Sequence, residues 1–400
     1  MSATRLLLAA RARQQPEWAS LDRLKQVLHA LERKPPLVDA SVCDDLTAEL
    51  ARAATGRGFA LFVGECAERF AEARPETVLA KADQLHRLAD GLAEATGLPV
   101  TRVGRIAGQY AKPRSHPTET LADGTVLPVY RGDAVNAPEP RPQARVADPS
   151  RLLRAYHHAE TTLSTLFERD LGLAGQTAPE RTYAGHEALL LEFEQALVRP
   201  APDGAGQYGS SGHFLWIGER TRQLDHEHVQ FAASVGNPVG VKVGPTADPG
   251  EVAALIGALN PRRRPGRLTL IVRMGAAHVG RRLPELLDRL GAAAADVAWV
   301  CDPMHGNTRV NGAGQKTRAL TDVMAETEAF VLALHRRGLP PAGLMLETAH
   351  RPVTECVATP AEAAVAEPLP HYETACDPRL DPEQARLVTA FTADLLEAGR

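Results

Sequence analysis

Residues 59–68 read FALFVGECAE, a short apolar run that is followed at once by charged and polar residues. A run of this length, rich in β-branched and aromatic residues, is typical of a strand buried in a parallel sheet. The same change from apolar to polar recurs along the chain. We predict eight strands of this kind, at Phe59–Val63, Val100–Val103, Phe214–Ile217, Val239–Val243, Leu268–Val272, Val297–Val300, Leu344–Leu346 and, with a weaker pattern, His371–Thr374.

Segments compatible with helices separate most of these runs, at 76–95, 249–258, 283–294 and 321–337. Gly338 follows the last of them, where a glycine commonly ends a helix. Eight strand–helix alternations predict an α/β fold, a (β/α)8 TIM barrel whose chemistry gathers at the carboxyl ends of the strands. A doubly wound open sheet is the alternative, but it would concentrate its site at one switch point, whereas polar motifs follow every run.

The segment before the first run reads as helices with a Pro-rich turn at Pro35–Pro36. We therefore expect a short helical extension at 1–55 and a catalytic barrel at 56–400. The first residues, MSATRLLLAARARQQ, are basic, but their apolar core at Leu6–Ala10 is shorter than the about 7 residues of a secretory signal. A helical arm is the expected structure there.

The composition excludes several classes of protein. The 400 residues are 44% hydrophobic and 24% charged, as in a soluble globular chain, and no apolar run approaches the about 20 residues that span a bilayer. A net charge of −4 gives no electrostatic reason to expect nucleic acid or an anionic membrane as partner. Five cysteines form no disulfide framework and fit a reducing compartment, so we expect a cytoplasmic protein.

Four residues with metal-binding side chains lie within a few residues of the ends of different predicted strands: Cys66, His305, Glu347 and Asp377. Taken singly, each is more often a core, capping or ion-pair residue. On a barrel they converge, and a thiolate, an imidazole and two carboxylates together suit Mn²⁺, Fe²⁺, Co²⁺ or Zn²⁺ better than Mg²⁺ or Ca²⁺.

Cations also cluster at or just past the strand ends: Arg105, Lys112, Arg114, Arg220, Lys242, Arg273 and Lys316. Arginine forks match phosphate and carboxylate oxygens, so an anionic substrate would relieve the repulsion among these charges. The alternative is a solvated surface, or pairing with nearby acids such as Asp302. Lys242 fits that alternative poorly, because it lies within an apolar run. Glu187 is expected to open a helix, where a solvated or capping role is the default.

Ten motifs in fixed order resemble the type II 3-deoxy-D-arabino-heptulosonate 7-phosphate (DAHP) synthases, from about Phe59 to Leu380. They are GECAERF, RIAGQYAKPRS, YRGDAVN, HEALLLEFE, HFLWIGERTRQLD, GNPVGVKVGP, GRLTLIVRMG, WVCDPMHGNT, VTEC and YETACDPRL. The resemblance implies a metal-dependent, aldol-type condensation of phosphoenolpyruvate with erythrose 4-phosphate that releases phosphate, the first step of the shikimate pathway. Mn²⁺ is the first candidate for the metal.

The resemblance also implies roles for residues. It assigns the metal to Cys66, His305, Glu347 and Asp377, phosphoenolpyruvate to Arg105, Glu219, Arg220, Lys242 and Arg273, and erythrose 4-phosphate to Lys112, Arg114, Ser115 and Lys316. Lys112 is our candidate proton donor, which would need a pKa lowered by neighbouring cations. Glu187 is the candidate for activating water.

The sequence departs from the family pattern at several places. Glu65 stands where aspartate is usual, and ETAHRPVTEC puts Ala349, His350 and Arg351 into a loop that we expect to face the site. An amino-DAHP synthase, acting on an amino or imino analogue of erythrose 4-phosphate, is therefore one alternative; a catalytically degenerate barrel acting as a binding subunit is another.

The stretch between Tyr156 and Tyr183 is short, as in compact members that serve phenazine-type secondary metabolism. We expect weak regulation by aromatic amino acids and a homodimer or other homo-oligomer. We also expect Cys66 and Cys376 to lie near each other, because strands one and eight are neighbours in a closed barrel.

Overall fold

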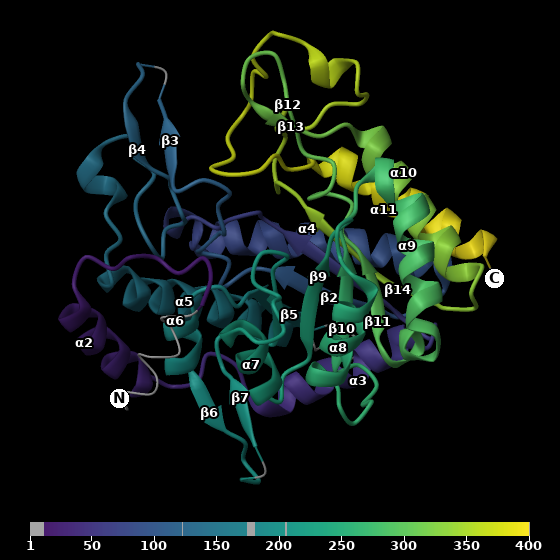
Figure 1. Cartoon of the computed structure of the whole chain (residues 1–400), viewed down its shortest axis with the longest axis horizontal. Helices are drawn as coiled ribbons and strands as arrows, with labels where there is room; N and C mark the ends of the chain where they lie inside the picture. Colours follow the sequence, from purple (N-terminus) through teal and green to yellow (C-terminus); the bar gives the residue numbers. More distant parts are fainter. Residues whose placement is uncertain (1–11, 122, 174–180, 205, 400) are drawn as a thin grey trace.

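Eight parallel strands close into a barrel (Figure 1). The computed structural model describes residues 12–121, 123–173, 181–204 and 206–399. Around the barrel the strands are β1 (Phe59–Gly64), β2 (Val100–Arg105), β5 (Thr182–Glu187), β8 (Phe214–Ile217), β9 (Val239–Val243), β10 (Leu268–Val272), β11 (Ala298–Cys301) and β14 (Pro341–Glu347), which pairs with β1. The predicted (β/α)8 barrel is confirmed.

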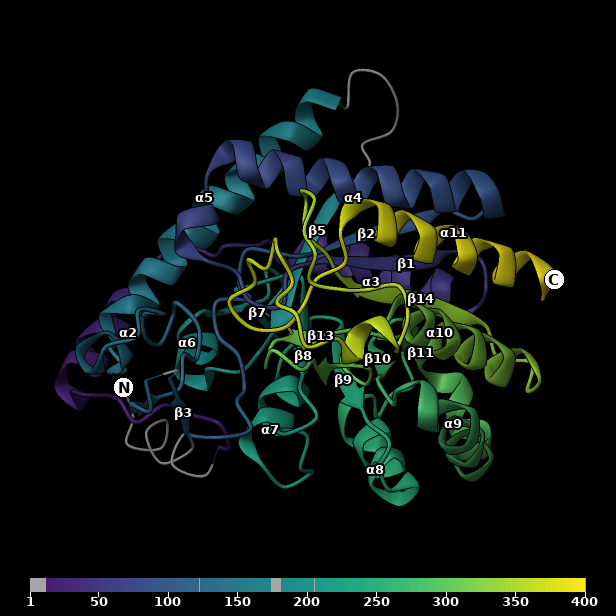
Figure 2. The same cartoon turned by 90° about the horizontal axis from the view of Figure 1, so that it is seen from above.

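A helix follows every barrel strand, and Figure 2 shows these helices surrounding the strands. In chain order they are α4 (Pro75–Thr96), α5 (Ser150–Leu173), α6 (Leu191–Ala196), α7 (Glu227–Ser234), α8 (Pro249–Leu259), α9 (Ala276–Leu290), α10 (Leu320–His335) and α11 (Pro382–Ala398). The apolar faces of most of these helices pack on the outer side of the strands in one extended core, while α5 packs in a second cluster. Gly338 closes α10 with a φ of 65°, as its position predicts.

The interior of the barrel is filled by large side chains. Phe62, Phe214 and Trp216 form a buried cluster there with Leu46 and Leu50, which belong to helix α3 (Ala40–Ala54). Burying a side chain of this size contributes about 1.5–3 kcal/mol, so the plug of α3 residues stabilises the closed barrel substantially.

A second helix of the amino-terminal segment, α2 (Leu21–Glu32), packs in a separate apolar cluster with residues of α5 and α6. Leu24, Val27, Leu28 and Leu31 are its buried residues, at the spacing of one helical face. The helical arm expected around Leu6–Ala10 lies outside the described residues.

One barrel strand was not predicted, and one predicted strand is absent. The third barrel strand, β5, was missed because it reads TYAGHE and has no continuous apolar run. Its small residues are required by packing: a Cβ on Gly185 would lie 2.9 Å from the carbonyl oxygen of Phe214. The segment 371–374, predicted as a strand, is irregular, and β14 is itself the eighth strand.

In the described part of the chain, three small hairpins lie outside the barrel: β3 (Thr118–Thr120) with β4 (Val126–Pro128), β6 (Val198–Pro200) with β7 (Gln207–Gly209), and β12 (Arg309–Val310) with β13 (Lys316–Thr317). Figure 1 shows the β3–β4 and β12–β13 hairpins on the side of the barrel opposite α3. Within the described ranges, no helix combines the length and apolar character needed to cross a membrane.

Candidate active site

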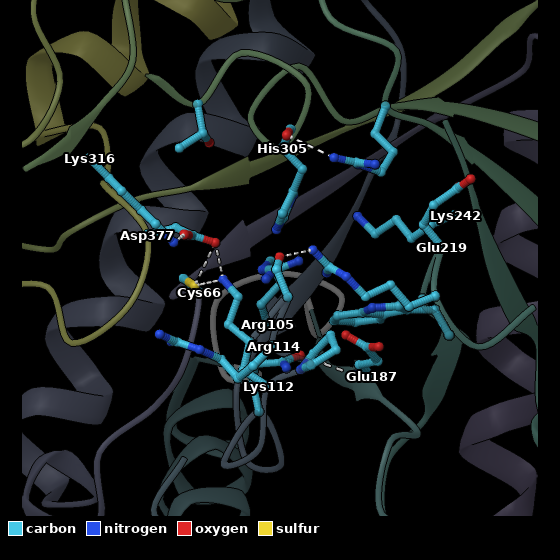
Figure 3. Close-up of a pocket in the computed structure, with 18 residues that line it drawn as sticks. Cys66, Arg105, Lys112, Arg114, Glu187, Glu219, Lys242, His305, Lys316 and Asp377 are labelled. Atoms are coloured by element: carbon cyan, nitrogen blue, oxygen red, sulfur yellow. Dashed lines mark hydrogen bonds and ion pairs between the residues drawn. The ribbon is translucent and has the colours of Figure 1, made fainter. Parts of the chain in front are cut away.

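A cavity of about 320 Å³ opens at the carboxyl ends of the barrel strands (Figure 3). Every residue that the sequence nominated for the site lines this cavity except Glu347, which contacts His305. The lining residues among them are Cys66, Arg105, Lys112, Arg114, Ser115, Glu187, Glu219, Arg220, Lys242, Arg273, His305, Lys316 and Asp377. Figure 3 shows Cys66, Asp377 and Lys316 on one side and Lys242 with Glu219 on the other.

The register of the strands brings Arg105, Glu347 and Cys66 together. Gly64, the last residue of β1, is paired with Arg105 of β2 on one side and with Glu347 of β14 on the other. Because the strands are parallel, their last residues meet at one rim, and Arg105 Nη2 donates to Glu347 Oε1 at 3.0 Å. Cys66 follows two residues after Gly64 and therefore enters the same rim.

The predicted metal ligands lie around one point. Ligand atoms of Cys66, Glu347 and Asp377 all lie within 4.8 Å of one another, and His305 Nε2 lies 3.0 Å from Glu347 Oε1. The other ring nitrogen of His305 lies 2.7 Å from Asp302 Oδ2, the carboxylate–histidine arrangement that orients an imidazole toward a metal. Sulfur, nitrogen and oxygen donors so placed fit a divalent transition metal.

The Glu347 carboxylate is surrounded by cations although no part of it is exposed. Burial opposes its ionisation, but His305, Arg318 and Lys112 outweigh burial and hold the pKa of Glu347 well below its usual range. Arg318, itself fully buried, lies 2.8 Å from Glu347 Oε2. Arg318 was missed at the sequence level, because nothing in KTR indicates that its arginine points inward to a carboxylate.

Asp377 is held by two lysines. Lys316 Nζ lies 2.7 Å from its Oδ1, and the Lys112 ammonium contacts both its Oδ2 and the sulfur of Cys66. Burial alone would lower the pKa of Lys112, but Asp377, Cys66 and Glu347 outweigh it and raise that pKa. The lowered pKa expected for Lys112 is therefore wrong for the protein chain alone, because its nearest neighbours are anions rather than cations. Asp377 belongs to the loop after β14, not to a strand end of its own.

Two buried cations of the cavity pack against Trp216. Arg105 and Lys242 are 3% and 5% exposed, and both lie over the Trp216 ring, at 5.1 and 5.8 Å from its centroid. Burial lowers the pKa of Lys242 to about 8, against the opposing charge of Asp302. Both cations already have an acidic partner, Lys242 in Asp302 and Arg105 in Glu347, so the pairing with a nearby acid that Lys242 was expected to fit poorly does occur. The clustering of further cations in the same cavity still favours a ligand that brings phosphate or carboxylate oxygens.

Arg220 and Arg273 extend this positive wall to the loops. Arg220 Nη2 donates to Ser115 Oγ at 2.7 Å, which joins the loop after β8 to the loop after β2. Arg273 Nη2 donates to the carbonyl oxygen of His305 at 2.8 Å. Glu219 accepts from the backbone N–H of Gly244 at 2.7 Å, so its carboxylate braces neighbouring loops.

Glu187 does not open a helix, as was expected from sequence; it is the last residue of β5. Its Oε1 is buried and has no hydrogen-bond partner among the residues that the structure describes. Burial raises the pKa of Glu187, although Lys242 and Lys112 oppose the shift. A buried carboxyl group of raised pKa at the wall of a cavity is suited to taking or giving a proton.

The loop at 349–351 does not face the site, so this expectation was wrong. None of its residues lines the cavity. Arg351 pairs at the surface with Glu373, at 2.8 Å, and the Ala349 carbonyl accepts from Gln84 at 2.8 Å. Burial, with Lys81 in support, lowers the pKa of His350 to about 4.

Cys376 lies in hydrogen-bonding contact with Cys66, so the two thiols are neighbours. That contact, with Lys112 and Arg114 in support, lowers the pKa of Cys376 to about 7. Burial raises the pKa of Cys66 well above its usual range. All five cysteines are unpaired. The expected proximity was right, although it arises from the loop after β14 rather than from adjacent strand ends.

A TIM barrel whose cavity joins a mixed donor set to clustered cations defines a barrel enzyme for anionic substrates. The sequence model of the Class-II DAHP synthetase family matches residues 4–172 and 167–393. The chain belongs to this family and is a 3-deoxy-7-phosphoheptulonate synthase, the enzyme of the first step of the shikimate pathway.

Relatives and one solved structure agree with this assignment. Phospho-2-dehydro-3-deoxyheptonate aldolase of Streptomyces coelicolor is 40% identical over 96% of this chain and 95% of its own. The AroG protein of the same name from Mycolicibacterium smegmatis is 37% identical over 97% and 93%. The structure of phospho-2-dehydro-3-deoxyheptonate aldolase from Francisella tularensis superposes with a TM-score of 0.56 at 13% identity, covering 96% of this chain and 99% of that one, and it bears out the fold.

Proposed function

We propose that the cavity binds one divalent metal at Cys66, His305, Glu347 and Asp377 and condenses phosphoenolpyruvate with erythrose 4-phosphate beside it. The observation that carries the proposal is that the donor set and the cation cluster share one cavity of about 320 Å³. The metal, when bound, supplies Lewis-acid polarisation of the aldehyde. The mixed set of a thiolate, an imidazole and two carboxylates suits Mn²⁺, Fe²⁺, Co²⁺ or Zn²⁺, and we place Mn²⁺ first.

Phosphoenolpyruvate is proposed to lie against the wall formed by Arg105, Lys242, Arg220 and Arg273, with Glu219 bracing the loops. Its phosphate and carboxylate bring several negative charges, which these cations neutralise. The Lys242 and Arg105 side chains are already desolvated, so little rearrangement is needed when the substrate arrives.

Erythrose 4-phosphate is proposed to enter from the side of Lys112, Arg114, Ser115 and Lys316. Its aldehyde carbon then faces C3 of phosphoenolpyruvate, and a carbon–carbon bond forms between them. The aldehyde oxygen takes up a proton, for which Lys112 is the proposed donor because its ammonium lies at the ligand cluster. A metal bound at Cys66, Glu347 and Asp377 would offset the negative charges that raise the pKa of Lys112, which favours proton donation.

Water adds to C2 of the phosphoenolpyruvate unit and loses a proton, and the C–O bond to phosphate then breaks. Glu187 is proposed to take the proton from this water. Its raised pKa and its unpaired Oε1 make the ionised form a stronger base than a solvated glutamate.

An assay of phosphate release with phosphoenolpyruvate, erythrose 4-phosphate and Mn²⁺ tests the proposal directly. Activity that requires all three, and that chelation abolishes, is the expected result; product formed without metal would contradict it. The amino analogue of the acceptor receives no support, because the loop at 349–351 that motivated it does not line the cavity. The complete set of charged residues in the cavity likewise speaks against a degenerate binding subunit.

We further propose a cytoplasmic homo-oligomer that serves a secondary pathway of the phenazine type. The five unpaired cysteines support a reducing compartment. Phe167 and Leu171, on successive turns of α5, are 64% and 58% exposed and support burial against a second copy. Light scattering of the purified protein tests the oligomer: a monomer at all concentrations would refute it.

A further inference from the structure

Two neighbouring loops carry different parts of the proposed site and are packed as one unit. The loop after β10 carries Arg273, and the loop after β11 carries His305. Arg273 Nη2 donates to the His305 carbonyl oxygen at 2.8 Å. The residue proposed to hold phosphate is thus hydrogen-bonded to the backbone of a residue proposed to hold the metal.

Two glycines bring the loops into backbone contact. Gly275 has a φ of 82°, and a Cβ there would lie 2.7 Å from the carbonyl oxygen of Gly306. A Cβ on Gly306 would lie 2.2 Å from the nitrogen of Gly275. With no room for a side chain at either position, a displacement of one loop is passed directly to the other.

Glu326 of helix α10 is buried beneath the two loops and hydrogen-bonds to both. Its side chain is 0% exposed. Oε1 accepts from the backbone N–H groups of Met274 and Gly275 at 2.7 and 2.8 Å, and Oε2 accepts from Asn307 Nδ2 at 2.8 Å. Every partner of this carboxylate is a donor, and the first two belong to the Arg273 loop while the third belongs to the His305 loop.

Asn307 completes the link from the other side. Its Oδ1 accepts from the backbone N–H of Ala276 at 2.9 Å, and its Nδ2 also donates to the Pro303 carbonyl at 2.8 Å. Glu326 and Asn307 therefore form a closed set of hydrogen bonds across both loops. In a buried network of this kind each bond reinforces the others, so the loops order together.

We propose that Glu326 is a positioning residue that couples metal binding at His305 to phosphoenolpyruvate binding at Arg273. The inference rests on the roles proposed above for those two residues. A ligand that orders one loop lowers the entropic cost of ordering the other, so each ligand tightens the binding of the other. Such coupling is reciprocal and typically amounts to about 5–150-fold in affinity.

Calorimetry measures this coupling without reference to turnover. The dissociation constant of Mn²⁺ is determined with and without saturating phosphoenolpyruvate, and that of phosphoenolpyruvate with and without Mn²⁺. We expect both ratios to be equal and above about 5 for the unmodified protein. In Glu326→Gln the amide oxygen keeps the two backbone donors, but the amide nitrogen faces Asn307 Nδ2, donor against donor. Both ratios should then fall toward one.

A reciprocal substitution distinguishes a loss of coupling between the two ligands from a general disruption of the fold. Glu326→Gln combined with Asn307→Asp restores a donor–acceptor pair across the loops, although it gives up the hydrogen bond to the Pro303 carbonyl. A ratio above that of Glu326→Gln alone would support the link. Glu328→Gln, exposed two residues along the same helix, is the matched control and should keep the full ratio. Asn307→Ser removes the same link from the loop side and carries the same expectation if Glu326→Gln does not fold.

The outcomes are distinct. A Glu326→Gln protein with an undiminished ratio overturns the inference, as does an unmodified protein that binds both ligands with a ratio of one. An Asn307→Ser protein with an undiminished ratio also overturns it, because the link would then not run through Asn307. An unmodified protein that binds no Mn²⁺ or no phosphoenolpyruvate contradicts the proposed function instead.

Discussion

Lys242 and Asp302 form a buried ion pair in the wall of the cavity, with side chains 6% and 0% exposed. The same Asp302 carboxylate lies 2.7 Å from His305 Nδ1, so one acid serves a proposed substrate lysine and a proposed metal ligand. Burial opposes the ionisation of Asp302, but its contacts with His305 and Lys242 outweigh burial and hold the pKa of Asp302 well below its usual range. The pair is therefore charged in the resting protein up to the pKa of Lys242.

The first prediction follows from the pKa of Lys242, which is lowered to about 8. Below that pH the ammonium is present and attracts phosphate; above it the neutral amine does not. We expect kcat/KM for phosphoenolpyruvate to fall as the pH rises through about 8, by about tenfold per pH unit if this charge is essential. In Lys242→Arg, which stays charged, the fall should move to higher pH. A profile that is flat to pH 10 would remove Lys242 from the proposed binding wall.

The second prediction concerns the metal. His305→Ala should lose bound metal and activity together and keep its fold, because the barrel core is built from other residues. Elemental analysis, a phosphate-release assay and circular dichroism provide the three readouts. His278→Ala, on the exposed face of α9, should change none of them. Full metal content in His305→Ala would show that the ligand set is different.

The third prediction concerns Arg273. A lysine cannot reproduce a guanidinium fork, and one charge-assisted hydrogen bond is worth about 1.5–3 kcal/mol. We expect Arg273→Lys to lower kcat/KM by more than about tenfold. Arg281→Lys, whose side chain is 68% exposed, is the matched control. A near-normal value for Arg273→Lys would exclude a bidentate role.

The fourth prediction concerns the neighbouring thiols of Cys66 and Cys376. In metal-free protein, dioxygen should oxidise them to a disulfide with formation of hydrogen peroxide, because the lowered pKa of Cys376, about 7, makes its thiolate available. Activity should return only with reductant and metal together. Peptide mapping of aerobic, chelated protein decides the matter, with Cys376→Ser as the control; two free thiols in inactivated protein would refute the switch.

The fifth prediction concerns regulation. An allosteric site needs a second binding surface and a second state of the fold. In the described part of the segment between β2 and β5, α5 is the only long helix, so this segment offers little material for such a site. We expect weak or absent inhibition by phenylalanine, tyrosine and tryptophan in steady-state assays. Inhibition at low micromolar concentration by any of them would contradict this expectation.

Much of the barrel was predictable because a strand buried on both faces must be apolar. Seven strands, β1 among them, were recognised from their apolar residues, although β2 also carries Arg102 and β9 carries Lys242. β5 was not recognised, because Gly185 and its small neighbours are required by close contact with Phe214, a partner distant in sequence. The residues of segment 371–374 are compatible with a strand. However, β1 pairs directly with β14, so the closed barrel has no place for this segment.

The sequence by itself determined most of the parallel strands, the order in which polar motifs follow them along the chain, and the residue types that meet at the barrel rim. These features are local, since apolar runs and the polar residues after them can be read within a few positions. Only the tertiary structure decided which groups touch. It placed Arg318 on Glu347, gave Lys112 anionic neighbours that raise its pKa, and joined two loops through Glu326. Burial and charge pairing depend on residues far apart in the chain, so only the folded protein defines them.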